Sequence, residues 1–160
     1  MTQTDKKQGP PTPPFTTSGP VTVLTDSLHF NTHGDADVVD LTEDVRELLR
    51  SSGLRTGILT IFAPGATGAV TTLEFEPGVV SDVRELFDRV ASPTEHYHHN
   101  DTHPDRNGHA HVRAALLGPS LVVPFADGEP CLGRWQEICF LCFDNRPRER
   151  TVMVQMLGVR

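Results

Sequence analysis

No stretch of the 160-residue chain approaches the roughly 20 consecutive apolar residues of a membrane-spanning helix. The first 20 residues also lack the apolar core of a signal peptide. Lysine and arginine form no cluster, and the formal net charge is −7. Since nucleic acids and anionic membranes are bound by clustered cations, we expect neither as a partner. We expect a cytoplasmic protein whose acidic surface keeps it soluble.

Cysteine is also scarce, with three residues that are all near the C-terminus. An odd number so close together is no disulfide framework, which suits a reducing compartment. Cys139 and Cys142 have the C-x-x-C spacing found in zinc and redox sites. Their surroundings are apolar and strand-like, and residues three apart on a strand point to opposite faces. We therefore interpret both thiols as core residues rather than metal ligands.

Five of the 13 prolines lie in residues 1–20, separated by polar residues. Such a segment buries little apolar surface, so we expect a disordered tail. Residues 21–160 contain no internal repeat and are long enough to build one domain with its own core. The sequence therefore predicts a proline-rich tail followed by a single domain.

Apolar spacing predicts two longer helices, over residues 40–53 and 79–90, and a short helix over 111–118. Gly53 and Gly118 are suited to end the first and the last of these. Segments rich in β-branched and aromatic residues predict strands over 21–24, 57–64, 69–78, 120–125, 132–143 and 151–158. Helices and strands do not alternate strictly. This order favours an α+β fold with a mostly antiparallel sheet.

Histidine is concentrated in one segment, with six of the eight residues between positions 96 and 111. Neutral imidazole is the commonest metal ligand near neutral pH. Adjacent His98 and His99 diverge in an extended loop, and His109 and His111 would lie about 200° apart on a helix. Geometry therefore predicts that two or three of these histidines line one site. A solvated loop that is merely rich in histidine is the alternative.

Several short blocks near the histidines occur in a specific order. They are YHHN at 97–100, NGHAH at 107–111, GPS at 118–120, LGRWQ at 132–136 and FDNRPRER at 143–150. With TTLEFEPG they extend over most of residues 21–158, and their order resembles the YjbQ (UPF0047) family. The resemblance implies a small α+β protein that forms a homotrimer. Members of that family are labelled as uncharacterised proteins or as secondary thiamine-phosphate synthases.

Three positions of the family site correspond to Glu74, His99 and His111. Most members carry His-Thr-Thr-Ala where this chain has Gly65–Gly68, so one family histidine is missing. Zinc in catalytic sites usually takes three protein ligands and a water, and this chain retains two imidazoles. Glu74 or an extra histidine could complete the set, and loss of tight metal binding is the alternative. We predict zinc ligands at His99 and His111, with Glu74 and His111 as catalytic residues.

Candidate contacts to a phosphorylated small molecule are Asn107, Gln136 and Arg146. Arginines at 146, 148 and 150 alternate along a predicted strand, and guanidinium groups suit phosphate oxygens. Arg146 follows a turn and is the best candidate of the three. Surface salt bridges to nearby acids are the alternative for all of them.

Two neighbours of these candidates are expected to be structural. Glu76 would share a strand face with Glu74, and paired acids on such a face are commonly solvated. Trp135 is the sole tryptophan, and we expect it in the core.

Two classes of function fit these residues. The first is an enzyme: a transferase joining a pyrimidine diphosphate to a thiazole phosphate, as the resemblance implies, or a metal-dependent hydrolase. The chain lacks the glycine-rich loop before a helix that often cradles phosphate. The second class is a non-catalytic trimer that binds a metal or a small anion. A trimer would also cover the strand edges of so short a chain.

Overall fold

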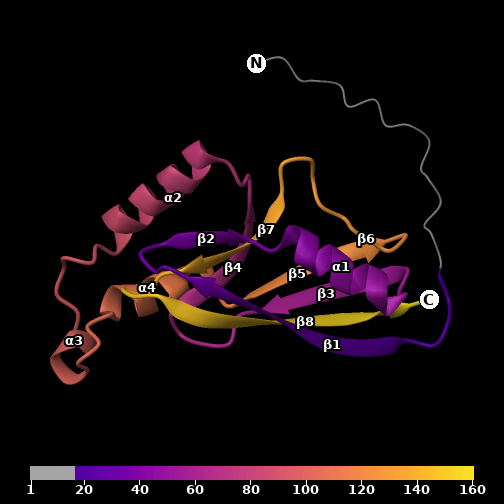
Figure 1. Cartoon of the computed structure of the whole chain (residues 1–160), viewed down its shortest axis with the longest axis horizontal. Coiled ribbons are helices and arrows are strands. Elements are labelled where there is room, and N and C mark those ends of the chain that lie inside the picture. Colours follow the sequence, from indigo (N-terminus) through magenta and orange to yellow (C-terminus); the bar gives the residue numbers. More distant parts are fainter. Residues whose placement is uncertain (1–16) are drawn as a thin grey trace, which may run out of the picture.

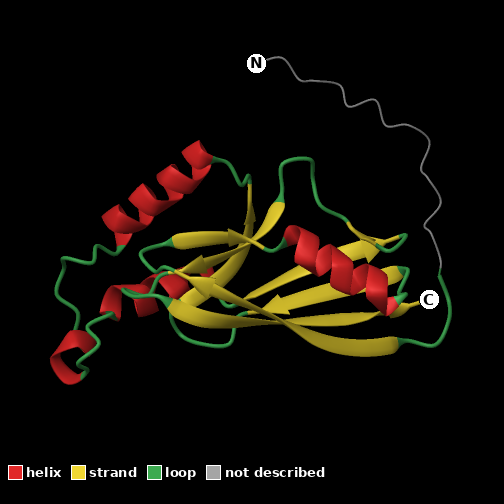
Figure 2. Ribbon diagram, viewed as in Figure 1, coloured by secondary structure: helices red, strands yellow, loops and turns green. Residues whose placement is uncertain are grey.

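A computed structural model describes residues 17–160, so most of the predicted tail lies outside the described residues. This part of the chain forms eight strands and four helices, whose arrangement can be followed in Figures 1 and 2. They are β1 (Thr22–Thr32), β2 (Asp37–Asp40), α1 (Thr42–Ser52), β3 (Thr56–Phe62), β4 (Gly68–Leu73), α2 (Pro77–Val90), α3 (His99–Thr102), α4 (Gly108–Leu117), β5 (Ser120–Ala126), β6 (Glu129–Pro130), β7 (Glu137–Cys142) and β8 (Arg148–Val159). No helix in residues 17–160 is both long and apolar enough to cross a membrane.

The strands form two sheets, with the orders β1-β8-β3-β5-β6 and β2-β7-β4. Every pairing between described strands is antiparallel. The predicted α+β class with a mostly antiparallel sheet is confirmed. Sequence analysis missed the short elements β2, β6 and α3, because two to four residues carry too little periodicity to detect.

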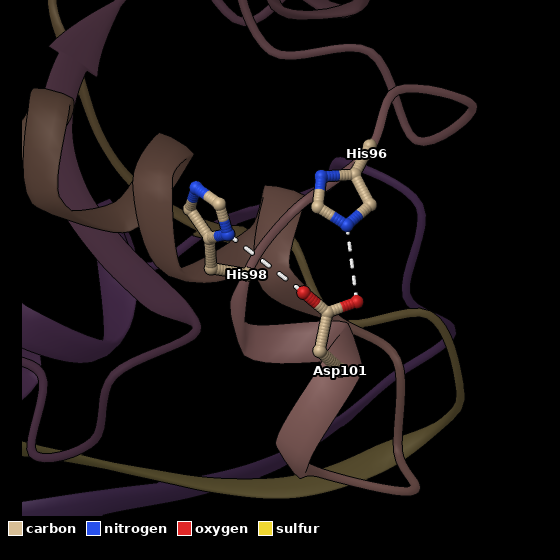
Figure 3. A group of neighbouring side chains, drawn as sticks. All are labelled: His96, His98 and Asp101. Atoms are coloured by element: carbon tan, nitrogen blue, oxygen red, sulfur yellow. Dashed lines mark hydrogen bonds and ion pairs between the residues drawn. The ribbon is translucent and has the colours of Figure 1, made fainter.

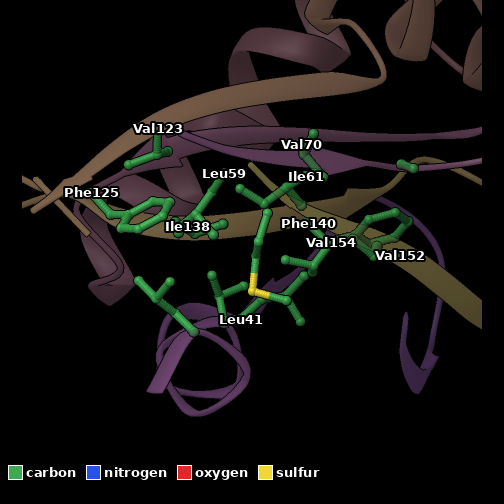
Figure 4. Packing of buried hydrophobic residues seen from close by; sticks show 14 of the residues in the cluster. Leu41, Leu59, Ile61, Val70, Val123, Phe125, Ile138, Phe140, Val152 and Val154 are labelled. Carbon is green, nitrogen blue, oxygen red and sulfur yellow. The ribbon is translucent and has the colours of Figure 1, made fainter. Parts of the chain in front are cut away.

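The main core lies between the inner face of the five-stranded sheet, the three-stranded sheet and α1, as Figure 4 shows. Leu59 and Ile61 of β3 are fully buried, whereas Ile58 and Phe62 on the other face are exposed. This alternation follows from the period of two of a strand. Residues 17–160 of a single copy therefore leave the outer face of the large sheet uncovered.

Strand β7 is the centre of the smaller sheet and is buried on both faces. Phe140 and Cys142 belong to the main core, whereas Cys139 and Leu141 belong to a second cluster that Phe87 of α2 and Ala114 of α4 complete. The two thiols thus lie on opposite faces, as predicted from the strand period. Burial raises the pKa of Cys139 to about 12.

The predicted strand over 69–78 ends early, at Leu73. Pro77 occupies the first turn of α2, and the Glu76 carboxylate caps that helix by accepting from the backbone N–H groups of Gly78 and Val79. These two hydrogen bonds lower the pKa of Glu76. The expectation that Glu74 and Glu76 share a strand face is wrong, because the cap requires the chain to leave the sheet.

The predicted strand over 132–143 begins late, at Glu137. Residues 133–136 instead form a turn in which Gln136 N donates to the Gly133 carbonyl at 3.0 Å. Trp135 is 59% exposed, and the Arg134 guanidinium lies 4.6 Å from its ring centre. The expectation of a core tryptophan is therefore wrong: the turn carries the indole out of the sheet.

Candidate functional site

The histidine segment folds back on itself, so that α3 faces the start of α4. The rings of His99 and His111 lie 4.5 Å apart between centroids, at 57°. His103 stacks on His99 in parallel, at 4.4 Å. The predicted approach of His99 to His111 is present, although twelve positions separate them. We call His99 and His111 the inner pair.

The fold-back depends on a close contact at the start of α4. A Cβ added to Gly108 would lie 2.5 Å from Cβ of Tyr97, so only glycine fits this position. Gly108 N donates to Asn100 Oδ1 at 3.0 Å, which ties α3 to α4. The Tyr97 hydroxyl donates to the Ser92 carbonyl at 2.8 Å. These contacts fix the backbone on which the histidines are mounted.

A chain of hydrogen bonds runs from a buried acid to His99. Asn107 Nδ2 donates to Asp144 Oδ1 at 3.4 Å, and because a carboxylate only accepts, this contact orients the amide. Asn107 Oδ1 then faces His99 Nε2 at 3.1 Å. An amide oxygen also only accepts, so Nε2 of His99 carries the proton. In the neutral ring, Nδ1 is left as the free base or metal ligand.

Asp144 is the anchor of this chain and is only 1% exposed. Its carboxylate accepts from Arg148 Nε at 2.8 Å and from the Thr67 hydroxyl at 3.2 Å, and Arg150 Nη2 lies 3.7 Å away. Burial raises the pKa of Asp144, but the hydrogen bond and charge of Arg148 outweigh it, so the pKa is below its ordinary value. Asp144 is therefore a charged, fixed acceptor.

His111 lines an open hollow of about 180 Å³ that His99 does not line. The rest of its lining is formed by small residues: Gly65, Ala66, Gly68, Ala114, Ala115 and Pro119. A Cβ added to Gly65 would meet nothing within 4 Å. Gly65, where the family pattern has a histidine, thus leaves the hollow open beside His111.

Glu74 and Gln136 lie at the opposite end of the smaller sheet. In the β4–β7 register, Gly68 pairs with Cys142 and Leu73 with Glu137. Residue 74 is therefore about 20 Å along the chain from Gly68, at about 3.3 Å per strand residue. Within one chain, the structure does not bring Glu74 or Gln136 to the inner pair.

Gln136 contributes to a separate polar hollow of about 370 Å³. Its Nε2 donates to the Thr72 hydroxyl at 3.2 Å, and its Oε1 accepts from Gly133 N at 2.8 Å. Arg46, Arg134 and three acids also line this hollow. Both the oxygen and the nitrogen of the Gln136 amide are thus hydrogen-bonded within the chain, the oxygen to a residue of the same turn.

Among the three alternating arginines, Arg148 and Arg150 are held by Asp144. Arg146 is exposed, and no carboxylate of the described residues lies within 4.0 Å of its guanidinium. Arg148 and Arg150 therefore form salt bridges, which was the alternative to phosphate binding. The neighbouring Asn145 donates from Nδ2 to the Asp105 carbonyl at 2.8 Å, which ties this turn to the histidine loop.

His109 and His111 face different directions from α4, as their spacing of two residues predicted. It is 4% exposed, and its Nδ1 has no hydrogen-bond partner among the described residues. Burial, and then the charge of Arg113, lower the pKa of His109. His109 is thus a neutral core residue, and His111 alone of the two faces the hollow.

Sequence reasoning missed two contributors, Asp144 and Asp105. Asp144 stood in the motif FDNRPRER, where an acid before three alternating arginines was a usable signal. Asp105 Oδ1 is buried without a hydrogen bond and lies 3.4 Å from His99 Nε2, on the same side as Asn107. Asp105 therefore supports the protonated Nε2 rather than the free Nδ1.

The inner pair suits a divalent metal in its donor chemistry. Zinc accepts imidazole nitrogens at about 2.0–2.1 Å, and rings 4.5 Å apart can share one ion after small rotations. The pair supplies two ligands, so at least two coordination positions remain for water or a ligand. Across residues 17–160, three candidate ligand atoms come within 4.8 Å of one another only at His96, His98 and Asp101 (Figure 3).

Residues 26–159 match the family model described as UPF0047 protein YjbQ-like. A UPF0047 protein of Methanothermobacter thermautotrophicus is 36% identical over 85% of this chain and 93% of its own length. UPF0047 protein YugU of Bacillus subtilis is 34% identical over 82% of this chain and 98% of its own.

Two crystal structures of similar proteins share the fold. A protein of unknown function from Sulfolobus solfataricus has a TM-score of 0.82 and 31% identity, covering 86% of this chain and 99% of its own. A hypothetical protein from Aeropyrum pernix has a TM-score of 0.79 and 36% identity, covering 84% and 98%. The order of the motifs, the antiparallel fold and these matches agree: the chain belongs to the YjbQ (UPF0047) family.

Proposed function

We propose that this protein binds a divalent metal ion, zinc, through the inner pair and holds a small phosphorylated ligand beside it. The observation that carries this proposal is the hydrogen-bond chain from Asp144 through Asn107 to His99. It fixes the tautomer of His99 with Nδ1 free, which is the usual arrangement behind a metal-binding histidine. Water would complete the coordination in the absence of ligand.

A bound metal would supply a positive charge that neutralises phosphate oxygens. His111 would hold the metal from the rigid helix α4, beside the hollow that Gly65 leaves open. The exposed guanidinium of Arg146 is a further phosphate contact, since Arg148 and Arg150 are engaged by Asp144. Asn107 is 2% exposed and bonded at both ends, so we assign it a positioning role.

The size of the hollow favours a single small ligand. Its volume of about 180 Å³ is below the roughly 300–1,000 Å³ of ordinary ligand pockets. Thiamine-phosphate synthesis requires two phosphorylated substrates at once, and Glu74, the candidate base, lies at the other end of the sheet. Within one chain, these features favour binding of a metal and a small anion over two-substrate transfer.

The metal proposal is tested with protein purified without a histidine tag, stripped with a chelator and titrated with Zn²⁺. The His111→Ala variant should lose one equivalent of zinc, and with it any zinc-dependent binding of inorganic phosphate. His29→Ala removes an exposed histidine of β1 and should change neither. Unchanged zinc stoichiometry in His111→Ala would refute the proposal that the inner pair binds zinc.

The enzyme hypothesis has its own test. The zinc-loaded protein is incubated with the pyrimidine diphosphate and the thiazole phosphate, and thiamine phosphate and pyrophosphate are measured. Product that disappears in His111→Ala would assign the transferase to this site. Zinc binding without product would favour the non-catalytic alternative.

We also propose that copies of this chain associate, as trimers, through the outer face of the five-stranded sheet. On this face, neighbouring strands form three rows without an ionisable side chain: Val23, Leu157, Ile58 and Pro124; Thr25, Gln155, Thr60 and Val122; Ser27, Met153, Phe62 and Ser120. An uncharged apolar face of this kind is typical of a contact surface. Around a three-fold axis, each copy would turn this face toward the other two, so uncharged rows would meet and no charge would be buried.

The contact surface is tested by sedimentation velocity at micromolar concentration. Ile58→Glu places a charge in the centre of the face and should shift the protein toward the monomer. Val90→Glu, on the exposed side of α2, is the matched control and should leave the distribution unchanged. A wild-type monomer, or an assembly that Ile58→Glu leaves intact, would contradict this proposal.

A further inference from the structure

His96, His98 and Asp101 form a second cluster, on the outside of α3, that the proposed function does not use. Asp101 Oδ1 lies 3.0 Å from His96 Nε2, and Asp101 Oδ2 lies 3.7 Å from His98 Nδ1. Figure 3 shows the carboxylate pointing between the two imidazoles. One ligand atom from each residue lies within 4.8 Å of the other two. We call these three residues the outer group.

We propose that the outer group is a separate binding site for a transition-metal dication such as Zn²⁺, Ni²⁺ or Cu²⁺. Two imidazoles and one carboxylate form a donor set that these ions accept, whereas Mg²⁺ and Ca²⁺ prefer oxygen alone. The imidazole rings stand at 89° with centroids 5.3 Å apart, so their nitrogens approach one point from different directions. Water fills the remaining positions, because all three residues are exposed.

The backbone under the outer group is ordered by its own hydrogen bonds. Asp101 N donates to the His98 carbonyl at 3.1 Å, and Asn100 N donates to the Tyr97 carbonyl at 2.9 Å. His98 and Asp101 are three residues apart in a helical turn, which places their side chains on one face. The ligand-bearing segment is therefore preorganised, although its side chains are solvated.

The charge of the segment favours a cation at this place. Residues 95–105 include Glu95, Asp101 and Asp105 but no lysine or arginine. A metal bound by the outer group would therefore meet no nearby competing positive side chain from its own segment. The site does not rest on the proposed function, because none of its ligands belongs to the inner pair.

The helical period also separates the two sets of histidines. His98 and Asp101 share one face of α3, whereas His99 and His103 share another, four residues apart. His99 turns toward Asn107 and α4, away from the outer group. A metal at one site thus leaves the ligands of the other in place, and the two can be tested independently.

The test uses the full chain carrying His99→Ala and His111→Ala, which removes the inner pair. After chelator treatment, calorimetric titration with Zn²⁺ should show one equivalent, and titration with Mg²⁺ should show none. Adding His96→Ala or Asp101→Asn should weaken zinc binding at least about tenfold. Adding His33→Ala should have no effect, since His33 forms an exposed pair with Asp37 at 3.2 Å but is not in the outer group.

Two results would overturn the outer site: no zinc binding in the double variant, or binding that survives both His96→Ala and Asp101→Asn at full strength. All of these changes except His99→Ala and His111→Ala are at exposed side chains, and circular dichroism confirms the fold. If the wild-type chain and the double variant each bind one equivalent of zinc, the outer group binds zinc and the inner pair does not. Two equivalents in the wild type support both.

Discussion

His99 of the inner pair and His98 of the outer group are adjacent in sequence at the start of α3, yet the side chains that support the two sets differ. The inner pair rests on Asn107 and, through it, on Asp144, which is 1% exposed. The outer group rests on Asp101, whose side chain is 54% exposed. The hydrogen bond to the buried Asn107 fixes both the orientation and the tautomer of His99, whereas water competes for each contact of the outer group. Histidine content alone therefore does not distinguish a preorganised site from a solvated one.

The two regions also differ in electrostatics. Behind the inner pair, the charge of Asp144 is compensated by Arg148, and Arg146 remains free to meet an anion. Around the outer group, only acids are charged in residues 95–105. We therefore expect the inner pair to hold a metal together with an anionic ligand, and the outer group to hold a metal ion alone.

The largest difference should appear when each supporting acid is removed. Asp144→Ala leaves Arg148 and Asn107 without their acceptor in a buried place, and we expect a loss of about 3 kcal/mol in the free energy of unfolding. Arg148 is partly exposed and can turn to water, which limits the loss. Asp101→Ala should change stability by less than about 0.5 kcal/mol. Urea denaturation of both variants measures the contrast, and equal losses would contradict it.

Asn107→Ala tests the inner pair without removing a ligand. The substitution frees His99 to adopt either tautomer, so zinc affinity at the inner pair should fall about 10- to 100-fold. Zinc bound by the outer group should be unaffected. Calorimetric titration in the His96→Ala background, where the outer group is weakened, measures the inner pair, and titration in the background with His99→Ala and His111→Ala measures the outer group. Unchanged affinity would mean that the hydrogen-bond chain does not prepare His99.

Acid stability should also depend on the inner region. Because the folded pKa of Asp144 lies below its ordinary value of 3.8, the unfolded chain binds the proton more tightly. The stabilisation is thus fully present above about pH 4 and is lost as the pH falls through the folded pKa. Asp144→Asn should flatten this part of the curve, while Asp101→Asn should not. Parallel acid dependence of wild type and Asp144→Asn would exclude Asp144 as a contributor.

The sequence predicted the fold class and the longer helices because their apolar periods persist over ten or more residues. The family resemblance also predicted one site for His99 and His111, whose rings the structure places 4.5 Å apart. The sequence could not predict the chain from Asp144 to His99, because its first hydrogen bond joins Asp144 to the buried amide of Asn107, 37 residues away in sequence. Trp135 and Glu76 were misplaced because a turn and a helix cap replaced the predicted strand ends. Local contacts of this kind override periodicity near the ends of elements.

The smallest effect is expected at His103, which lies between the two regions. Its ring stacks on His99 at 4.4 Å but is exposed, and its Nδ1 contacts only the Thr102 hydroxyl, at 2.9 Å. Exposed stacking contributes little, so His103→Ala should change the free energy of unfolding by less than about 0.5 kcal/mol. Zinc affinity at either site should stay within about threefold, since the hydrogen bonds that orient the ligands come from Asn107 and Asp101 instead. A tenfold loss at the inner pair would make His103 a third ligand in place of the missing family histidine.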